Sequence, residues 1–278
     1  MQYILYNELA NNGKGKETAE SLSNKLNSGS MLVNVCDISL NEWIDDVTKD
    51  DSLIICGGDG TLNRFVNDID QKKVNCNVMI YPAGTGNDFL RDIKEFYDNS
   101  EMPSINKYIE KLPTVRIKDK EFKFINGIGF GIDGMCCEEA DKLKAKGKKE
   151  INYAGLSVKL MLFKYKCPHA TITIDDKVYE YKKAWLASAM NGRYYGGGMK
   201  AAPEQDRLSD TLTNVVFHDK GKIATLIAFP SIFKGEHVNK SVTTVLTGKK
   251  INVKFDSPMA LQIDGETVLD VTEYTAWK

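Results

Sequence analysis

Two glycine-rich segments of the sequence contain residues that could hold phosphate groups. The first, Gly57-Gly58-Asp59-Gly60-Thr61, directly follows the apolar run 53–56, and the second, residues 82–89, follows the apolar run 78–81. Glycines let backbone N–H groups approach an anion closely, and a helix that begins at such a loop adds the positive end of its dipole. Both segments therefore predict phosphate binding. The alternative for the first is a tight strand-to-helix turn in which Asp59 acts only as a cap.

A pair of carboxylates near the end of the sequence could act on an acceptor hydroxyl. Asp264 and Glu266 are separated by Gly265. In phosphoryl transfer, a carboxylate can orient the acceptor hydroxyl and take its proton. Two residues apart, the side chains would share a face of an extended strand, whereas a turn at Gly265 would redirect one of them. The sequence leaves open which of the two is the base, and a hairpin turn with two solvated acids is the alternative.

The first hundred residues predict alternating strands and helices that would position the glycine-rich loops. Short apolar runs predict strands at 2–6, 31–36, 52–56 and 78–81. Helical spacing predicts helices within 17–26, 39–47 and 62–69. Such alternation is typical of a doubly wound α/β domain with a parallel sheet, expected here over residues 1–112. In that sheet, loops at the carboxyl ends of neighbouring strands meet at one edge, so the two glycine-rich loops should converge.

From Pro113 onward, strand-like segments dominate. They are 122–128, 170–174, 178–190, 212–217, 241–246, 251–255 and 261–263, interrupted by helical insertions at 138–166 and 222–233. Asp175-Asp176 lies between two of these runs and is expected to form a hairpin turn. We therefore predict a second, mainly antiparallel β-sandwich domain over residues 113–278.

Composition limits the classes of partner. The 278 residues include 37 Lys+Arg and 38 Asp+Glu, and this balance gives no overall attraction to nucleic acid, so no nucleic-acid partner is expected. The six cysteines lack metal-ligand spacing and no secretory signal is visible, which favours a cytoplasmic protein. The apolar stretch 223–233 is far shorter than the roughly 20 residues of a membrane span.

Two segments could bring the protein transiently to a membrane surface. Residues 223–233 combine apolar side chains with flanking lysines, and residues 142–149 are lysine-rich. Such segments can bind the interface of an anionic bilayer. The alternative is a core helix for the first segment and a solvated charged face for the second.

Together, the two glycine-rich loops resemble those of the diacylglycerol kinase catalytic-domain family, the soluble bacterial lipid kinases related to sphingosine and ceramide kinases. Further family-like signatures follow in the expected order, namely residues 126–133 (Asn-Gly-Ile-Gly-Phe-Gly-Ile-Asp), Gly196-Gly197-Gly198-Met199 and Asp264-Gly265-Glu266. The resemblance covers nearly the whole chain.

This resemblance implies a fold like those of NAD kinase and diacylglycerol kinase, with ATP bound in the cleft of two domains. It implies Mg²⁺-dependent transfer of the γ-phosphoryl group to a lipid hydroxyl, with diacylglycerol as the expected acceptor. The residues that it places at the nucleotide are Gly57, Gly58, Asp59, Gly60, Thr61, Asn63, Gly84, Thr85, Asn87 and Asp88. It also places Asp264 and Glu266 at the reacting hydroxyl. A structural Mg²⁺ is implied at Asp210 and the backbone carbonyls of Arg207 and Leu212.

The sequence leaves open two other functions and one oligomeric state. NAD kinases share the first glycine-rich loop, but residues 84–88 favour a lipid kinase over an NAD kinase. The chain could also be a catalytically silent lipid or nucleotide sensor, against which the presence of Asp59, Asp264 and Glu266 argues. An exposed edge strand in the second domain could pair two protomers into a homodimer.

Overall fold

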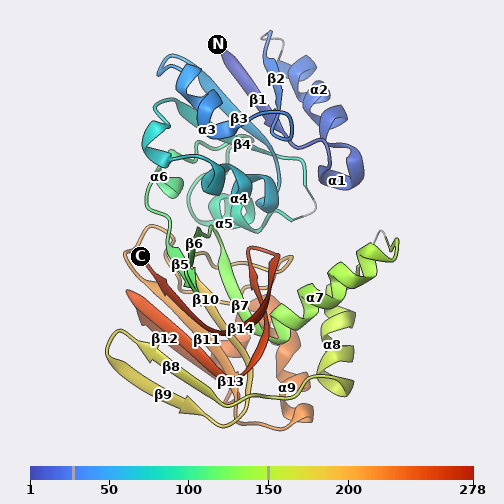
Figure 1. Cartoon of the computed structure of the whole chain (residues 1–278), viewed down its shortest axis with the longest axis vertical. Coiled ribbons are helices and arrows are strands. Elements are labelled where there is room, and N and C mark those ends of the chain that lie inside the picture. Colours follow the sequence, from blue (N-terminus) through green and yellow to red (C-terminus); the bar gives the residue numbers. More distant parts are fainter. Residues whose placement is uncertain (27–28, 85, 149–150) are drawn as a thin grey trace. The chain divides into compact units, whose positions relative to one another are not determined.

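Four short apolar strands form a parallel sheet in the N-terminal part of the chain, shown in the computed structural model of Figure 1. The strands are β1 (Gln2–Tyr6), β2 (Met31–Asn34), β3 (Ser52–Gly57) and β4 (Asn77–Pro82), in the order β2-β1-β3-β4. The structure describes residues 1–26, 29–84, 86–148 and 151–278. Leu53, Ile54 and Ile55 of β3 are fully buried, as expected for a parallel sheet covered on both faces. The predicted α/β fold is confirmed.

The helices of this part are α1 (Ala10–Gly13), α2 (Gly15–Leu26), α3 (Leu40–Trp43), α4 (Asp59–Asp68), α5 (Asp88–Phe96) and α6 (Asn106–Ile109), with 3₁₀ turns η1 (Ile44–Asp46) and η2 (Gln71–Lys73). α4 begins three residues before the predicted start at Leu62, because the Leu62 N–H already bonds to the Gly58 carbonyl. The helix predicted across 39–47 is instead α3 followed by the single turn η1.

The chain divides into two units, Met1–Leu112 and Pro113–Lys278. The strands of the second are β5 (Thr114–Ile117), β6 (Lys120–Lys123), β7 (Gly127–Gly131), β8 (Ala170–Ile174), β9 (Lys177–Tyr181), β10 (Ala184–Met190), β11 (Leu212–His218), β12 (Thr243–Gly248), β13 (Lys250–Ile263) and β14 (Glu266–Trp277). All of their pairings are antiparallel, in agreement with the predicted β-rich fold. β8 and β9 form the hairpin expected at Asp175-Asp176.

The long strand β13 joins the two parts of this sheet. Its first half pairs with β8 and its second half with β7, and the register shifts between Lys254 and Leu261 allow it to bend. The segments 251–255 and 261–263, predicted separately, therefore belong to one strand. Phe130 of β7 stacks on Phe255 of β13 with ring centroids 4.0 Å apart, in the apolar core.

Other predicted boundaries differ from the structure. The segment 122–128 is not one strand, because residues 124–126 form a turn between β6 and β7. The insertion 138–166 comprises α7 (Ile132–Ala145) and α8 (Tyr153–Phe163), and 222–233 comprises α9 (Lys222–Ala228) and most of η3 (Phe229–Lys234), followed by η4 (Glu236–Asn239). Among the described residues, no helix is long and apolar enough to cross a bilayer.

Candidate functional site

Asp59 connects the two glycine-rich loops. Its carboxylate accepts hydrogen bonds from the backbone N–H groups of Asp88 (2.9 Å) and Phe89 (3.1 Å), the first residues of α5. Its own N–H donates to the Gly86 carbonyl (3.0 Å). Asp59 therefore caps the helix that follows the other loop. The two loops converge at one edge of the sheet, as the parallel topology predicts.

Close packing between the loops explains two of the glycines. A Cβ on Gly58 would clash with the Gly86 carbonyl oxygen, and a Cβ on Gly84 would lie 2.8 Å from the Gly58 Cα. Both neighbours are backbone atoms, which cannot move aside as a flexible side chain would. Part of the glycine content is thus needed by the fold itself, independently of any ligand.

Packing against other described residues does not explain why a glycine stands at position 60. A Cβ there would meet no atom within 4 Å, and the residue lies in the first turn of α4, where alanine would be favoured. Within the part of the chain that the structure describes, the N–H groups of Gly60 and Thr61 have no hydrogen-bond acceptor. Open space in front of unpaired N–H groups at a helix start suits a phosphate group.

The remaining predicted nucleotide residues surround this point. Asn87 donates from its side-chain amide to the Gly84 carbonyl (2.7 Å), which stabilises the second loop. Asp88 is buried at the start of α5. Asn63 lies on α4, where its side-chain oxygen accepts a bond from Asn67 (3.3 Å). Thr85 lies outside the described residues.

In the second unit, the carboxylate of Asp264 is held by backbone amides. It accepts hydrogen bonds from the N–H groups of Ile125 (2.6 Å), Asn126 (2.8 Å) and Gly127 (3.0 Å). Asp264 and Gly265 form the two-residue turn between β13 and β14, both with positive φ (49° and 96°). This turn is the second of the two arrangements that the sequence allowed, and it gives the two carboxylates different surroundings.

Glu266 differs from Asp264 in its exposure and in its hydrogen bonding. It is exposed, and it is the first residue of β14. Its carboxylate has no hydrogen bond or ion pair with any residue that the structure describes. Asp264 is thus held by the turn at 125–127, whereas the Glu266 side chain faces solvent.

A buried polar network, which the sequence analysis missed, supports the same turn. Arg207 is only 2% exposed, and its guanidinium donates to the Ile125 carbonyl and to the Asn126 side chain (2.9 Å for the latter). Asn191 also donates to the Ile125 carbonyl (3.0 Å). Asn126 belongs to a recognised signature, but no sequence pattern connects it to Arg207, which lies 81 residues later.

The residues implied as a structural metal site do not fit a divalent cation. The Arg207 carbonyl accepts a hydrogen bond from the ammonium group of Lys278, which also donates to the Asn191 side chain (2.8 Å). Leu212 is the first residue of β11, and Asp210 is exposed beside it. A positive group therefore already contacts one of the three proposed ligands. Burial lowers the pKa of Lys278 to about 8, and the Arg207 charge acts in the same direction.

We expect EDTA to leave the thermal unfolding midpoint of the ligand-free protein unchanged, because the Arg207 carbonyl already accepts a bond from the Lys278 ammonium group. Lys278→Met should lower that midpoint, since two acceptors lose their donor at a cost of about 1 to 3 kcal/mol. Scanning calorimetry with EDTA and with added Mg²⁺ would measure both effects. A midpoint that falls in EDTA and returns with Mg²⁺ would contradict this account.

A second buried carboxylate lies at the start of α7. Asp133 accepts a hydrogen bond from the Tyr195 hydroxyl, and both residues are buried. Burial raises the pKa of Asp133 to about 7, although the bond from Tyr195 acts in the opposite direction. Asp133 thus keeps its proton in the folded protein at pH values where it would lose it in the unfolded chain.

The raised pKa of Asp133 predicts a pH-dependent stability. The stabilisation that the Asp133 proton adds to the free energy of unfolding is fully present below about pH 4. It amounts to on the order of 4 kcal/mol and is lost as the pH rises to about 7. Asp133→Asn should remove this loss, because the amide oxygen can still accept from Tyr195. The test is the free energy of unfolding in urea at pH 5 and pH 8 for both proteins. Equal pH dependence in the two would disprove the assignment.

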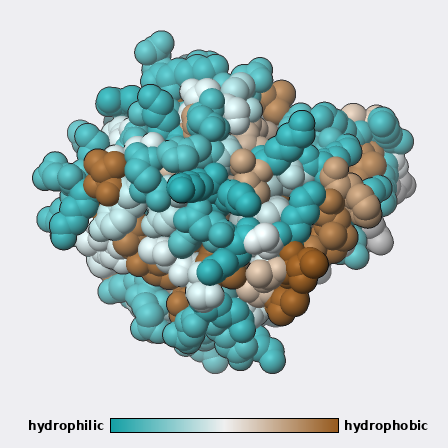
Figure 2. Space-filling view, turned by 90° about the horizontal axis from the view of Figure 1, so that it is seen from below, coloured by the Kyte–Doolittle hydropathy of each residue, from teal (hydrophilic) through white to brown (hydrophobic). Residues whose placement is uncertain are grey.

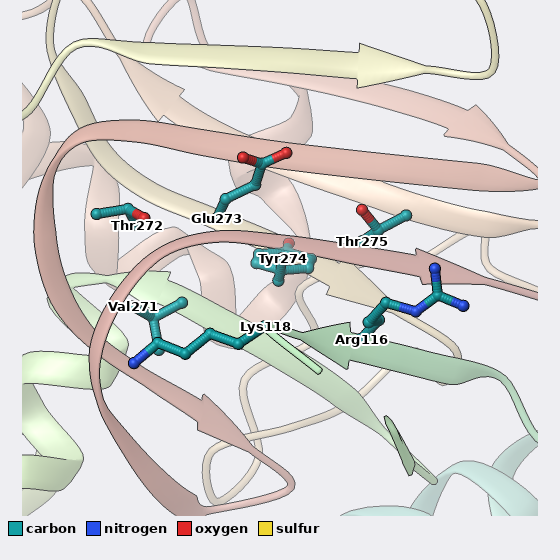
Figure 3. Close-up of a pocket in the computed structure, with 7 residues that line it drawn as sticks. All are labelled: Arg116, Lys118, Val271, Thr272, Glu273, Tyr274 and Thr275. Carbon is teal, nitrogen blue, oxygen red and sulfur yellow. The ribbon is translucent and has the colours of Figure 1, made fainter. Parts of the chain in front are cut away.

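Two surface hollows of the second unit are lined by residues other than Asp264 and Glu266. Figure 3 shows one of about 330 Å³, with Arg116 and Lys118 on one side and Glu273 and Thr275 on the neighbouring strand β14. Arg116 is already paired with Glu121 (2.6 Å). Neither Asp264 nor Glu266 lines this hollow, so it is not the expected acceptor site.

Comparisons with known proteins match both units of the chain. Residues 2–116 match the model of the diacylglycerol kinase catalytic domain, and residues 126–275 match the YegS C-terminal NAD kinase beta sandwich-like domain. A candidate lipid kinase of Staphylococcus haemolyticus is 28% identical over 260 residues, covering 86% of this chain and 77% of that protein. A candidate lipid kinase of Staphylococcus aureus strain MSSA476 is 26% identical over 259 residues, covering 88% and 79%.

Solved structures share the fold over nearly the whole chain. The crystal structure of a candidate diacylglycerol kinase from Bacillus anthracis superposes with a TM-score of 0.72 at 20% identity, covering 99% of this chain and 91% of that one. Yeast NADH kinase in complex with NADH gives a TM-score of 0.51 at 11% identity, covering 99% and 77%. At these identities the likeness establishes the fold alone.

Proposed function

Because the chain belongs to the diacylglycerol kinase catalytic-domain family, we propose that it is an ATP- and Mg²⁺-dependent lipid kinase that phosphorylates the free hydroxyl of diacylglycerol to give phosphatidic acid. The observation that carries this proposal is Gly60, a helical glycine that faces open space beside two N–H groups without an acceptor among the described residues. The candidate lipid kinases of staphylococci, similar over most of their length, support a lipid acceptor.

The first unit supplies the groups that would hold the nucleotide. The N–H groups of Gly60 and Thr61 would bind phosphate oxygens at the positive end of α4. Asp59 would contribute a protein ligand to the metal, since carboxylate oxygens that accept one N–H bond each keep further lone pairs. When bound, Mg²⁺ neutralises negative charge on the transferring phosphoryl group.

The second unit supplies the groups that would act on the acceptor. We assign Glu266 as the base that orients the lipid hydroxyl and takes its proton. As the hydroxyl oxygen bonds to the γ-phosphorus, the bond from that phosphorus to the β–γ bridging oxygen breaks, and ADP leaves with the electron pair. Asp264 acts as a positioning residue, because its carboxylate fixes the turn at 125–127.

The proposal is tested by an assay with γ-labelled ATP and separate acceptors, namely diacylglycerol, sphingosine, ceramide and NAD, each with and without Mg²⁺. We expect label in phosphatidic acid that depends on Mg²⁺. The fold shared with yeast NADH kinase makes NAD the necessary comparison. Label in NADP would replace this proposal with an NAD kinase activity, and no labelled product would favour a sensor.

A further inference from the structure

Large apolar side chains are exposed on α8, α9 and η3. Phe163, Ile223 and Ile227 are 77%, 74% and 76% exposed, and Leu162 and Phe233 are 39% and 42% exposed. We name these five side chains the apolar patch. Burying such side chains in water-free surroundings is strongly favourable, so a group of them left in contact with water marks an interaction surface.

The members of the apolar patch come from neighbouring elements. α8 packs against α9, and the Lys222 ammonium at the start of α9 donates to the Leu162 carbonyl (3.0 Å) near the end of α8. Ile223 and Ile227 are four residues apart, so they lie on one side of α9. Figure 1 shows α8 and α9 side by side, and the face seen in Figure 2 carries a broad group of brown, hydrophobic residues.

The charged residues within the two segments that contain the apolar patch are all lysines. Segments 151–168 and 220–235, which contain it, carry six lysines and no aspartate or glutamate. Those lysines are Lys159, Lys164, Lys166, Lys220, Lys222 and Lys234, and all are exposed. Lys164 pairs with Glu139 (3.0 Å), but the others have no acidic partner among the described residues. An apolar centre with a basic border is the composition that suits an anionic lipid interface.

We infer that the apolar patch and its lysines dock the protein on the surface of an anionic bilayer, with the apolar side chains entering the headgroup region. A second copy of the chain is a poorer occupant, because a two-fold contact would bring the same basic border from both copies together. The inference rests on the proposed function only in that a lipid acceptor requires access to a membrane.

The first experiment measures flotation of the full chain with vesicles of phosphatidylcholine, with and without phosphatidylglycerol. We expect binding only to the anionic vesicles, and weaker binding at high salt. The triple variant Phe163→Ser, Ile223→Ser, Ile227→Ser should bind at least about tenfold more weakly. The control is Val178→Ser, Leu269→Ser, which removes exposed apolar side chains elsewhere (61% and 54% exposed) and should bind like the wild type. Wild-type binding by the triple serine variant would overturn the inference.

The second experiment reverses charge at Lys159, Lys166 and Lys220 by substitution with glutamate. Each lysine near an anionic surface strengthens binding about fivefold, so we expect the triple glutamate variant to bind vesicles at least about 100-fold more weakly. Glutamate at Lys177, Lys250 and Lys254 changes the net charge equally and should lower binding far less. Equal losses in the two variants would show that net charge, and not the apolar patch, drives binding.

Two further measurements separate this inference from competing outcomes. The triple serine variant should phosphorylate a dispersed short-chain diacylglycerol like the wild type but lose activity on vesicles. If no lipid is phosphorylated in either form while vesicle binding holds, the proposed function fails and the docking surface stands. If light scattering shows a wild-type dimer that the triple serine variant breaks, without loss of vesicle binding, the patch is a contact between copies instead.

Discussion

Replacing Glu266 by glutamine should lower the rate of lipid phosphorylation by about 10² to 10⁴-fold while the protein stays as stable as the wild type. Glu266 is exposed and makes no hydrogen bond within the described part of the chain, so the fold does not depend on its charge. The substitution removes only the ability to take a proton. Steady-state kinetics with γ-labelled ATP, together with thermal unfolding, would measure both quantities. Near wild-type turnover would exclude Glu266 as the base.

The matched comparison is Asp264→Asn, which should act through the fold. The wild-type carboxylate accepts three backbone N–H bonds, and an amide group would turn donor hydrogens toward some of them. We expect a loss of about 1 to 3 kcal/mol in the free energy of unfolding, accompanied by lower activity. If Asp264→Asn is inactive but fully stable, Asp264 has the catalytic role and Glu266 does not.

Gly60→Ala should lower the affinity for ATP by about 100-fold without destabilising the protein. The new methyl group would meet no protein atom within 4 Å, and alanine in a helix is favoured over glycine by up to about 1 kcal/mol. The same methyl group would occupy the space of the proposed phosphate. The loss of about two charge-assisted bonds accounts for the affinity change. Nucleotide affinity from ATP-dependent kinetics, and the unfolding midpoint, would test this.

The contrasting variant is Gly58→Ala at the neighbouring position. Its methyl group would clash with the Gly86 carbonyl, so we expect the free energy of unfolding to fall by about 1 to 3 kcal/mol. Loss of ATP affinity in this variant would follow from the disturbed loops. Together, Gly60→Ala and Gly58→Ala distinguish a glycine required for ligand binding from a glycine required by the fold. Equal losses of stability in the two variants would contradict the argument from Gly60.

The fold class was predictable because its strongest signals are local. β3 is a continuous apolar run followed by glycines, which is typical of a buried parallel strand before a helix. β14 gave no comparable signal, because it exposes polar side chains along much of its length and buries only a few such as Val271 and Tyr274. The turn that divides the segment 122–128 was missed for a related reason, since its residues Phe124 and Ile125 are apolar and fully buried.

The candidate site was predictable in its residue types but not in their roles. The glycine-rich loops and the carboxylate pair stand out in the sequence, yet Asp59 caps a helix in the other loop and Asp264 holds a turn. The partners of Asp264 lie 137 to 139 residues away, and the ammonium group on the Arg207 carbonyl comes from Lys278. Such tertiary contacts leave no trace in local composition or spacing.

The central claim is that the loop residues before and within the first turn of α4 bind the phosphates of ATP. Calorimetric titration of Mg²⁺ and ATP into the wild-type protein and into Gly60→Ala tests it most directly. We expect saturable, Mg²⁺-dependent binding by the wild type and a roughly 100-fold weaker signal from a Gly60→Ala protein of equal stability. No binding by the wild type, or equal binding by both proteins, would contradict the account.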